Sequence, residues 1–144
     1  MQAMEISRTG LDVEWRRLET IAANLASANT PIGGNIASHQ THHLVSGPQS
    51  DFAARLDGQP NVDVARLAGV RVVGIDENSD PPRLVHEPGN PKANSAGFVQ
   101  YPAVDYAEQM TMLIKTSRAY ECNVVAMNSA RQMYSKALEL GRRS

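Results

Sequence analysis

The last third of the chain carries a repeat of apolar residues that is typical of one long helix. No glycine or proline interrupts the sequence from Ala103 to Leu140. Mostly apolar residues recur there in alternating steps of three and four, which places them on one face of a helix. They are Ala103, Tyr106, Met110, Leu113, Ser117, Tyr120, Val124, Met127, Arg131, Tyr134 and Leu138. A helix of about 36 residues would be about 54 Å long, and Gly141 is a plausible stop.

A shorter stripe of the same kind lies near the start of the chain and predicts a helix over residues 4–29. Its members are Leu11, Trp15, Leu18, Ala22 and Leu25. Thr30-Pro31, followed by Gly33-Gly34, should end this helix, because proline disfavours helical geometry in the residue before it. The start is open: Ser7 or Thr9 could cap a helix, and Gly10 weakens any turn that contains it.

The middle of the chain, residues 31–101, is poor in helix signals. It holds eight of the ten glycines and seven of the eight prolines. Three segments are rich in strand-forming residues, namely 62–75, 84–86 and 98–100. The last two are separated by Glu87-Pro88-Gly89-Asn90-Pro91, which is a strong turn signal. Residues 39–59 show no convincing period, and the order of residues 36–60 is left open.

These observations predict a mainly α protein with a small β insert, in which the terminal helices pair as an α-helical coiled coil. The expected divisions are 1–30 for the N-terminal helix, 31–101 for the irregular or β middle, and 102–144 for the C-terminal helix. Because the second stripe is about ten residues longer than the first, part of its apolar surface should stay exposed and favour association. An ordinary two-helix core in a monomer is the alternative.

Composition argues against several partners. The formal net charge is -1, which gives no electrostatic reason to expect nucleic acid or a membrane surface. No stretch approaches the ~20 apolar residues of a membrane span, so no membrane insertion is expected. The single cysteine excludes an internal disulfide. The first ten residues lack the order of a cleavable signal peptide; a route out of the cytoplasm would have to work without one.

No enzyme chemistry stands out. His39, His42 and His43 are possible metal ligands, but they lie in a stretch with no firm structure. No serine has a nucleophile-elbow pattern, and no phosphate loop or dinucleotide fingerprint is present. Cys122 is expected to be a buried or interface thiol rather than a nucleophile, and Trp15 a packing anchor. We therefore expect no catalytic residue, no cofactor and no metal.

Two segments resemble a known family. Residues 18–30, which include Asn24-Leu25-Ala26, are similar to the N-terminal signature of bacterial flagellar rod and hook proteins, with Ser27 where a second asparagine is usual. Residues 84–104 and the helix that follows resemble the proximal-rod members of that family. The chain departs from the family at residues 36–43, which replace a basic, tyrosine-containing stretch, so a hairpin there is in doubt. Ala103 also stands where asparagine is common.

The resemblance implies a structural subunit of the flagellar basal-body rod, exported unfolded by the flagellar type III apparatus without signal cleavage. Its partners would be other rod proteins and further copies of itself, in a helical assembly that transmits torque. Asn24 and Asn29 could satisfy backbone groups near the helix end. The expected assembly interface consists of Leu11, Trp15, Leu18, Ala22, Leu25, Met110, Leu113, Tyr120, Val124, Met127, Tyr134 and Leu138. A helical adaptor or export-chaperone-like binding module is the alternative, and a metal-dependent enzyme is a distant third.

Overall fold

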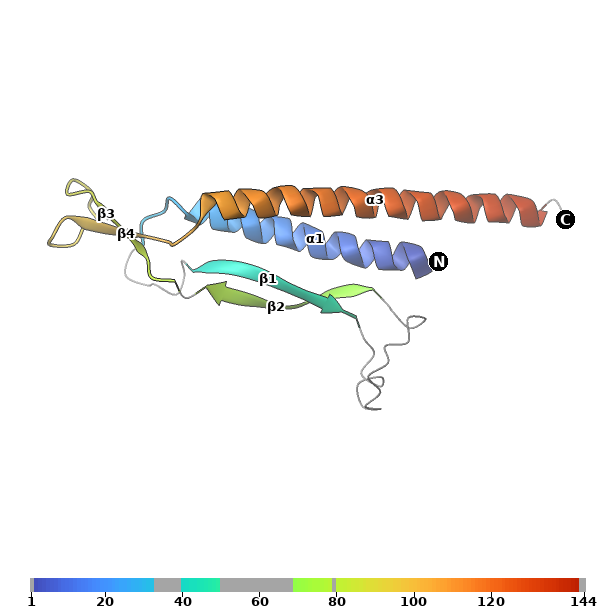
Figure 1. Cartoon of the computed structure of the whole chain (residues 1–144), viewed down its shortest axis with the longest axis horizontal. Helices are drawn as coiled ribbons and strands as arrows, with labels where there is room; N and C mark the ends of the chain where they lie inside the picture. The colour runs from blue at the N-terminus through green and yellow to red at the C-terminus, as the bar shows by residue number, and fades with distance from the viewer. Residues whose placement is uncertain (1, 33–39, 50–68, 79, 143–144) are drawn as a thin grey trace, which may run out of the picture. The chain divides into compact units, whose positions relative to one another are not determined.

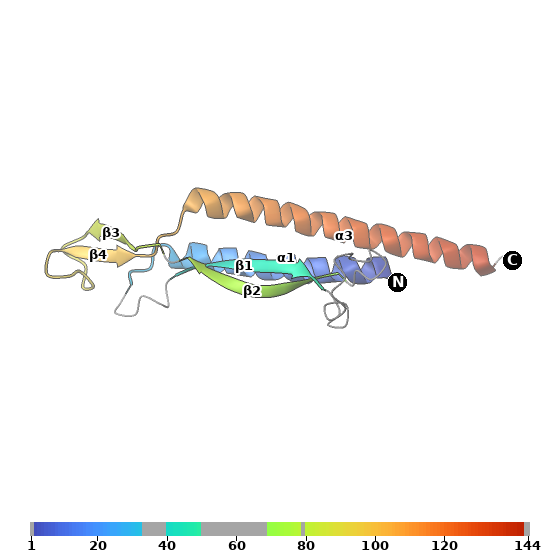
Figure 2. The ribbon, with the colours of Figure 1, turned by 60° about the horizontal axis from the view of Figure 1, so that its bottom comes forward.

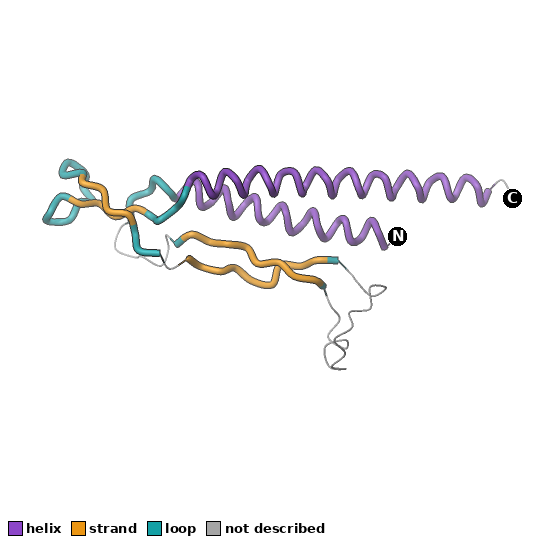
Figure 3. The backbone as a smooth tube through the Cα atoms, in the orientation of Figure 1, coloured by secondary structure: helices purple, strands orange, loops and turns teal. Residues whose placement is uncertain are grey.

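The structure is a computed structural model that describes residues 2–32, 40–49, 69–78 and 80–142. Helices occupy both ends, and two pairs of strands lie between them in sequence (Figures 1 and 3). In chain order the elements are α1 (Gln2–Ser27), β1 (Thr41–Pro48), β2 (Val70–Asn78), β3 (Arg83–His86), β4 (Phe98–Tyr101) and α3 (Tyr106–Arg142). This confirms the prediction of a mainly α protein with a small β insert.

The chain divides into two compact units. Among the described residues, the first unit takes 2–16, 45–49, 69–74 and 116–142. The second takes 17–32, 40–44, 75–78 and 80–115. Both helices continue from one unit into the other, and each unit contains a part of α1 and a part of α3. The contacts below are therefore given unit by unit.

Helix α1 begins at Gln2 and runs without a break through Gly10. Neither Ser7 nor Thr9 starts the helix, since both lie inside it. Gly10 is buried, so its missing side chain serves packing rather than a helix end. The helix ends at Ser27, shortly before Thr30-Pro31 as predicted, and the Thr30 N–H donates to the Ser27 carbonyl at 2.8 Å. The expected contribution of Gly33-Gly34 lies outside the described residues.

Helix α3 contains 37 residues and begins at Tyr106, three or four residues later than the stripe suggested. The cause is Asp105, whose side chain acts as an N-cap. Its Oδ1 accepts from the Ala107 N–H at 2.8 Å and from the Glu108 N–H at 3.3 Å. Gly141 does not stop the helix, which continues to Arg142.

Strands β1 and β2 form a two-stranded antiparallel sheet (Figure 1). Strand β1 falls in the segment for which no period was found and whose order was left open, so the sequence did not predict this strand. Thr41 is buried and the following three residues are half-buried, so burial does not alternate along the start of the strand. The predicted strand at 62–75 is confirmed from Val70 onwards, whereas 62–68 lie outside the described residues.

Strands β3 and β4, both of which were predicted, pair as an antiparallel hairpin in the second unit. Arg83 pairs with Tyr101 and His86 with Phe98. The predicted turn follows His86, and the Glu87 N–H donates to the Gly97 carbonyl at 2.8 Å. Gly97 has a φ of 78°, a left-handed conformation that favours glycine. Val99, in β4, is completely buried.

Candidate assembly surface on the terminal helices

In the first unit, α1 and α3 touch through a glycine and an aromatic pair. A Cβ atom on Gly10 would stand 2.9 Å from the Nδ2 atom of Asn123, so the missing side chain admits the asparagine. Five residues further along α1, the ring of Trp15 lies 6.4 Å from the ring of Tyr120 at an angle of 51°. Trp15 packs as an anchor, as expected, yet 55% of its surface is exposed.

In the second unit, the same two helices meet through amide side chains. The Nδ2 of Asn24 donates to the Oε1 of Gln109 at 3.1 Å, and the two residues are only 2% and 1% exposed. Near the end of α1, the Nδ2 of Asn29 donates to the Tyr106 hydroxyl at 2.9 Å. Asn24 satisfies backbone groups, as expected, but they are those of His42 in β1. Asn29 instead bonds to a side chain of α3.

The buried row of α1 is displaced by one residue from the predicted stripe. The buried residues of this helix are Gly10, Val13, Ile21 and Asn24, and Ala28 follows directly after its end. In the predicted stripe, Leu11, Leu18 and Leu25 are half-buried, and Trp15 and Ala22 are exposed. The buried row therefore combines apolar side chains with a glycine and an amide, and the Gly10 contact shows that α1 and α3 approach closely there.

Helix α3 divides the predicted interface residues into two groups. Half-buried members are Leu113, Tyr120, Val124 and Met127, and exposed members are Met110, Tyr134 and Leu138. Every residue from 131 to 142 is exposed. The expectation that part of the C-terminal stripe stays exposed is therefore confirmed within the described residues.

The exposed end of α3 has two different sides. At 100° per residue, one arc carries Met133, Tyr134, Ala137, Leu138 and Leu140, and the opposite arc carries Gln132, Ser135, Lys136 and Glu139. The exposed fractions of Met133, Leu138 and Leu140 are 67%, 58% and 70%. An apolar arc of this kind usually marks an interaction site.

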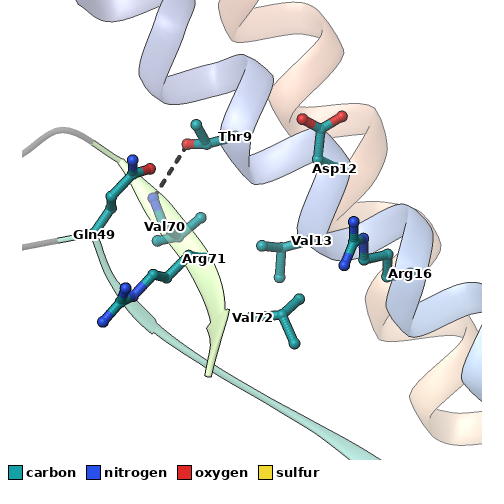
Figure 4. Close-up of a pocket in the computed structure, with 8 residues that line it drawn as sticks. All are labelled: Thr9, Asp12, Val13, Arg16, Gln49, Val70, Arg71 and Val72. Atoms are coloured by element: carbon teal, nitrogen blue, oxygen red, sulfur yellow. Dashed lines mark hydrogen bonds between the residues drawn. The ribbon is translucent and has the colours of Figure 1, made fainter. Parts of the chain in front are cut away.

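A groove of about 280 Å³ runs between α1 and β2 in the first unit (Figure 4). In this unit the sheet strands lie along α1 (Figure 2). Three valines contribute apolar wall: Val13 from α1, and Val70 and Val72 from β2. The Val70 N–H donates to the Thr9 hydroxyl at 3.1 Å and ties the strand to the helix. The lining also includes Asp12, Arg16, Gln49 and Arg71.

The residues considered for other chemistry are dispersed. His42 and His43 lie in β1, and His39 lies outside the described residues. Across residues 2–32, 40–49, 69–78 and 80–142, no group of three or more histidine, cysteine or acidic side chains could hold a metal ion. Cys122 is exposed on α3, so it is not buried within the chain, and the alternative of an interface thiol stays a prediction. In the part of the chain that the structure describes, no helix has the length and hydropathy of a membrane span.

The comparisons with known proteins agree with the resemblance found in the sequence. Residues 95–140 match the family described as flagellar basal body rod FlgEFG protein C-terminal. The flagellar basal-body rod protein FlgC of Bacillus subtilis is 30% identical, over 97% of each chain. That of Salmonella typhimurium is also 30% identical, over 98% of this chain and 97% of its own. The Borreliella burgdorferi protein of the same name is 28% identical, over 96% and 95%. This chain belongs to the FlgC family of flagellar basal-body rod proteins.

Proposed function

We propose that this chain builds the basal-body rod of the bacterial flagellum by packing its paired terminal helices against those of neighbouring rod subunits. Membership in the FlgC family makes it a structural protein of the basal body, not an enzyme, as predicted. The division into an N-terminal helix (1–30), a middle (31–101) and a C-terminal helix (102–144) remains part of this proposal, as does export by the flagellar type III apparatus.

The observation that carries the proposal is the exposed apolar arc at the end of α3. Gly10 and Asn123 are in contact, and the two helices run in opposite directions. Eight residues toward the start of α1 is Gln2, and eight residues toward the end of α3 is Arg131, so these two residues lie level. The described part of α1 therefore covers no residue of α3 after Arg131. Fully burying one of the exposed side chains there would contribute about 1.5–3 kcal/mol, so several together would favour packing between subunits.

Coiled-coil pairing of α1 and α3 is supported by the spacing of the contacts. Gly10 and Asn24 are fourteen residues apart, and so are their partners, Gln109 and Asn123. Fourteen residues are two heptads, the repeat of a left-handed coiled coil. In a rod, close-packed helices of this kind would carry torque, because packed interiors transmit strain.

Trp15, Met110 and Leu138 are exposed members of the wider interface that we propose. Its full membership is Leu11, Trp15, Leu18, Ala22, Leu25, Met110, Leu113, Tyr120, Val124, Met127, Tyr134 and Leu138. Many of these side chains keep apolar surface available outside the buried row of the helix pair. Contacts made by different surfaces of neighbouring subunits produce open helical assemblies when they do not close into a ring.

Leu138→Asp tests the proposal, with Gln132→Asp as the matched control on the polar arc of the same exposed segment. In cells that lack the unaltered gene, we expect L138D to abolish swimming and to be missing from purified basal bodies. Q132D should swim and assemble normally, since both variants add the same charge to the same exposed end. Normal recovery of L138D from basal bodies would contradict the proposal. Small closed oligomers that never enter basal bodies would instead favour the adaptor.

A further inference from the structure

The side chain of Asn24 binds strand β1 in the way that a neighbouring strand would. Its Nδ2 donates to the His42 carbonyl at 2.8 Å, and its Oδ1 accepts from the His42 N–H at 3.0 Å. A partner strand satisfies the same two backbone groups of a residue in an antiparallel ladder. One amide side chain of α1 thus takes the place of a peptide group beside His42.

The same side chain also holds α3. An asparagine amide has two N–H donors, and the second is used by the Oε1 of Gln109 at 3.1 Å. Asn24, His42 and Gln109 all belong to the second unit. Three elements therefore share one amide, which is 2% exposed. Buried polar groups are costly when they lose a partner, so the three positions depend on one another.

We infer that Asn24 is a positioning residue that clips the start of β1 to the helix pair, with Gln109 as the residue that orients it. The strand is held at His42 only when α1 and α3 are paired, because Gln109 fixes the amide in the orientation that β1 requires. This goes beyond rod assembly, since every contact lies within one chain. It couples the pairing of the terminal helices to the docking of the middle segment.

Two substitutions of Asn24 separate this role from simple packing. Asn24→Leu removes all three hydrogen bonds and replaces the amide with an apolar side chain of similar size. Asn24→Asp keeps an acceptor for the His42 N–H, and the Gln109 amide can turn so that Nε2, which has no partner among the described protein groups, donates to the carboxylate. If Asn24 only packed, the buried charge of N24D would disturb the structure more than the leucine of N24L. If Asn24 holds β1 by hydrogen bonds, N24L should loosen the strand at His42 more than N24D does.

The measurement is amide hydrogen exchange of the purified full chain, with the His42 rate divided by the mean rate of the β3–β4 hairpin to cancel global loosening. We expect N24L, which loses several hydrogen bonds, to raise this ratio by at least about tenfold. We expect N24D, which loses one, to raise it by about two- to fivefold. Gln109→Met should also raise it, although the Gln109 side chain bonds to Asn24 rather than to β1.

Asn29→Leu is the matched control, because it removes an exposed hydrogen bond to α3 from the turn that follows the same helix, and this bond does not involve β1. It should leave the His42 ratio unchanged. Equal ratios in N24L and N29L, a higher ratio in N24D than in N24L, or a His42 amide that is unprotected in the unaltered chain would each overturn the inference.

Discussion

Gly10 of α1 lies so close to Asn123 of α3 that a Cβ atom on the glycine would stand 2.9 Å from the Asn123 Nδ2 and 3.1 Å from its Cγ. Glycine weakens a helix interior by about 0.8–1 kcal/mol relative to alanine. At Gly10 this lower helix propensity is accompanied by a packing contact, because the absent side chain permits Asn123 of α3 to approach. The pair therefore supports a direct test of helix pairing.

We expect Gly10→Ala to bring no gain in stability when Asn123 is present, since the better helix propensity is offset by displacement of the asparagine. In an Asn123→Ala background, the same change should stabilise the chain by about 1 kcal/mol. A double-mutant cycle in urea measures the difference. Equal stabilisation in both backgrounds would show that the two side chains do not compete for the same space.

Gly69 precedes β2 with a φ of 111°, and a Cβ there would collide with the Thr9 hydroxyl. Gly69→Ala should lower the free energy of unfolding by about 1–3 kcal/mol through backbone strain. Gly74→Ala is the control, because a Cβ at Gly74 would meet no atom within 4 Å. Urea midpoints of the two variants provide the comparison, and equal midpoints would contradict the expected strain.

Asp105 caps α3 through two backbone N–H groups. Asp105→Ala should cost about 1 kcal/mol, whereas Asp105→Asn retains a capping oxygen and should cost little. Thermal melting followed by circular dichroism measures the loss. An alanine variant as stable as the asparagine variant would show that the cap contributes nothing.

The raised pKa of Tyr101 leads us to expect a loss of stability at alkaline pH. Burial raises the pKa of its hydroxyl above the usual value, and so does the hydrogen bond to Glu87 at 3.1 Å, while Arg83 lowers it. Because the folded chain holds this proton more tightly than the unfolded chain, the contribution is fully present below the unfolded pKa of about 10. It is lost as the pH rises through the higher folded pKa.

Tyr101→Phe should remove the contribution of Tyr101 to the loss of stability at alkaline pH. Below about pH 9, the free energy of unfolding should depend on pH with the same slope in both proteins. Unfolding in urea at several pH values between about 8 and 11 measures both curves. Glu87→Gln offers a second check, because it keeps a hydrogen-bonding group beside Tyr101 and removes the negative charge. An unchanged alkaline slope in Y101F would contradict the assignment to Tyr101.

The sequence by itself determined where the main elements lie and to which family the chain belongs. The uninterrupted stripe before Gly141 predicts a long helix, and the turn signal at residues 87–91 separates two predicted strands, because these signals are local. The family signature is also local, since it is carried by consecutive residues such as Asn24-Leu25-Ala26. Packing with distant residues was not needed to read any of them.

The tertiary structure decided which residues meet. The stripe of apolar residues pointed to Leu11 and Leu25, yet their neighbours Gly10 and Asn24 lie in the buried row. A glycine that admits a partner side chain cannot be told from a helix breaker until the opposing helix is in place. Strand β1 was missed for the same reason: His42 is held by Asn24, eighteen residues earlier, and a contact over that distance leaves no periodic signal in the strand itself.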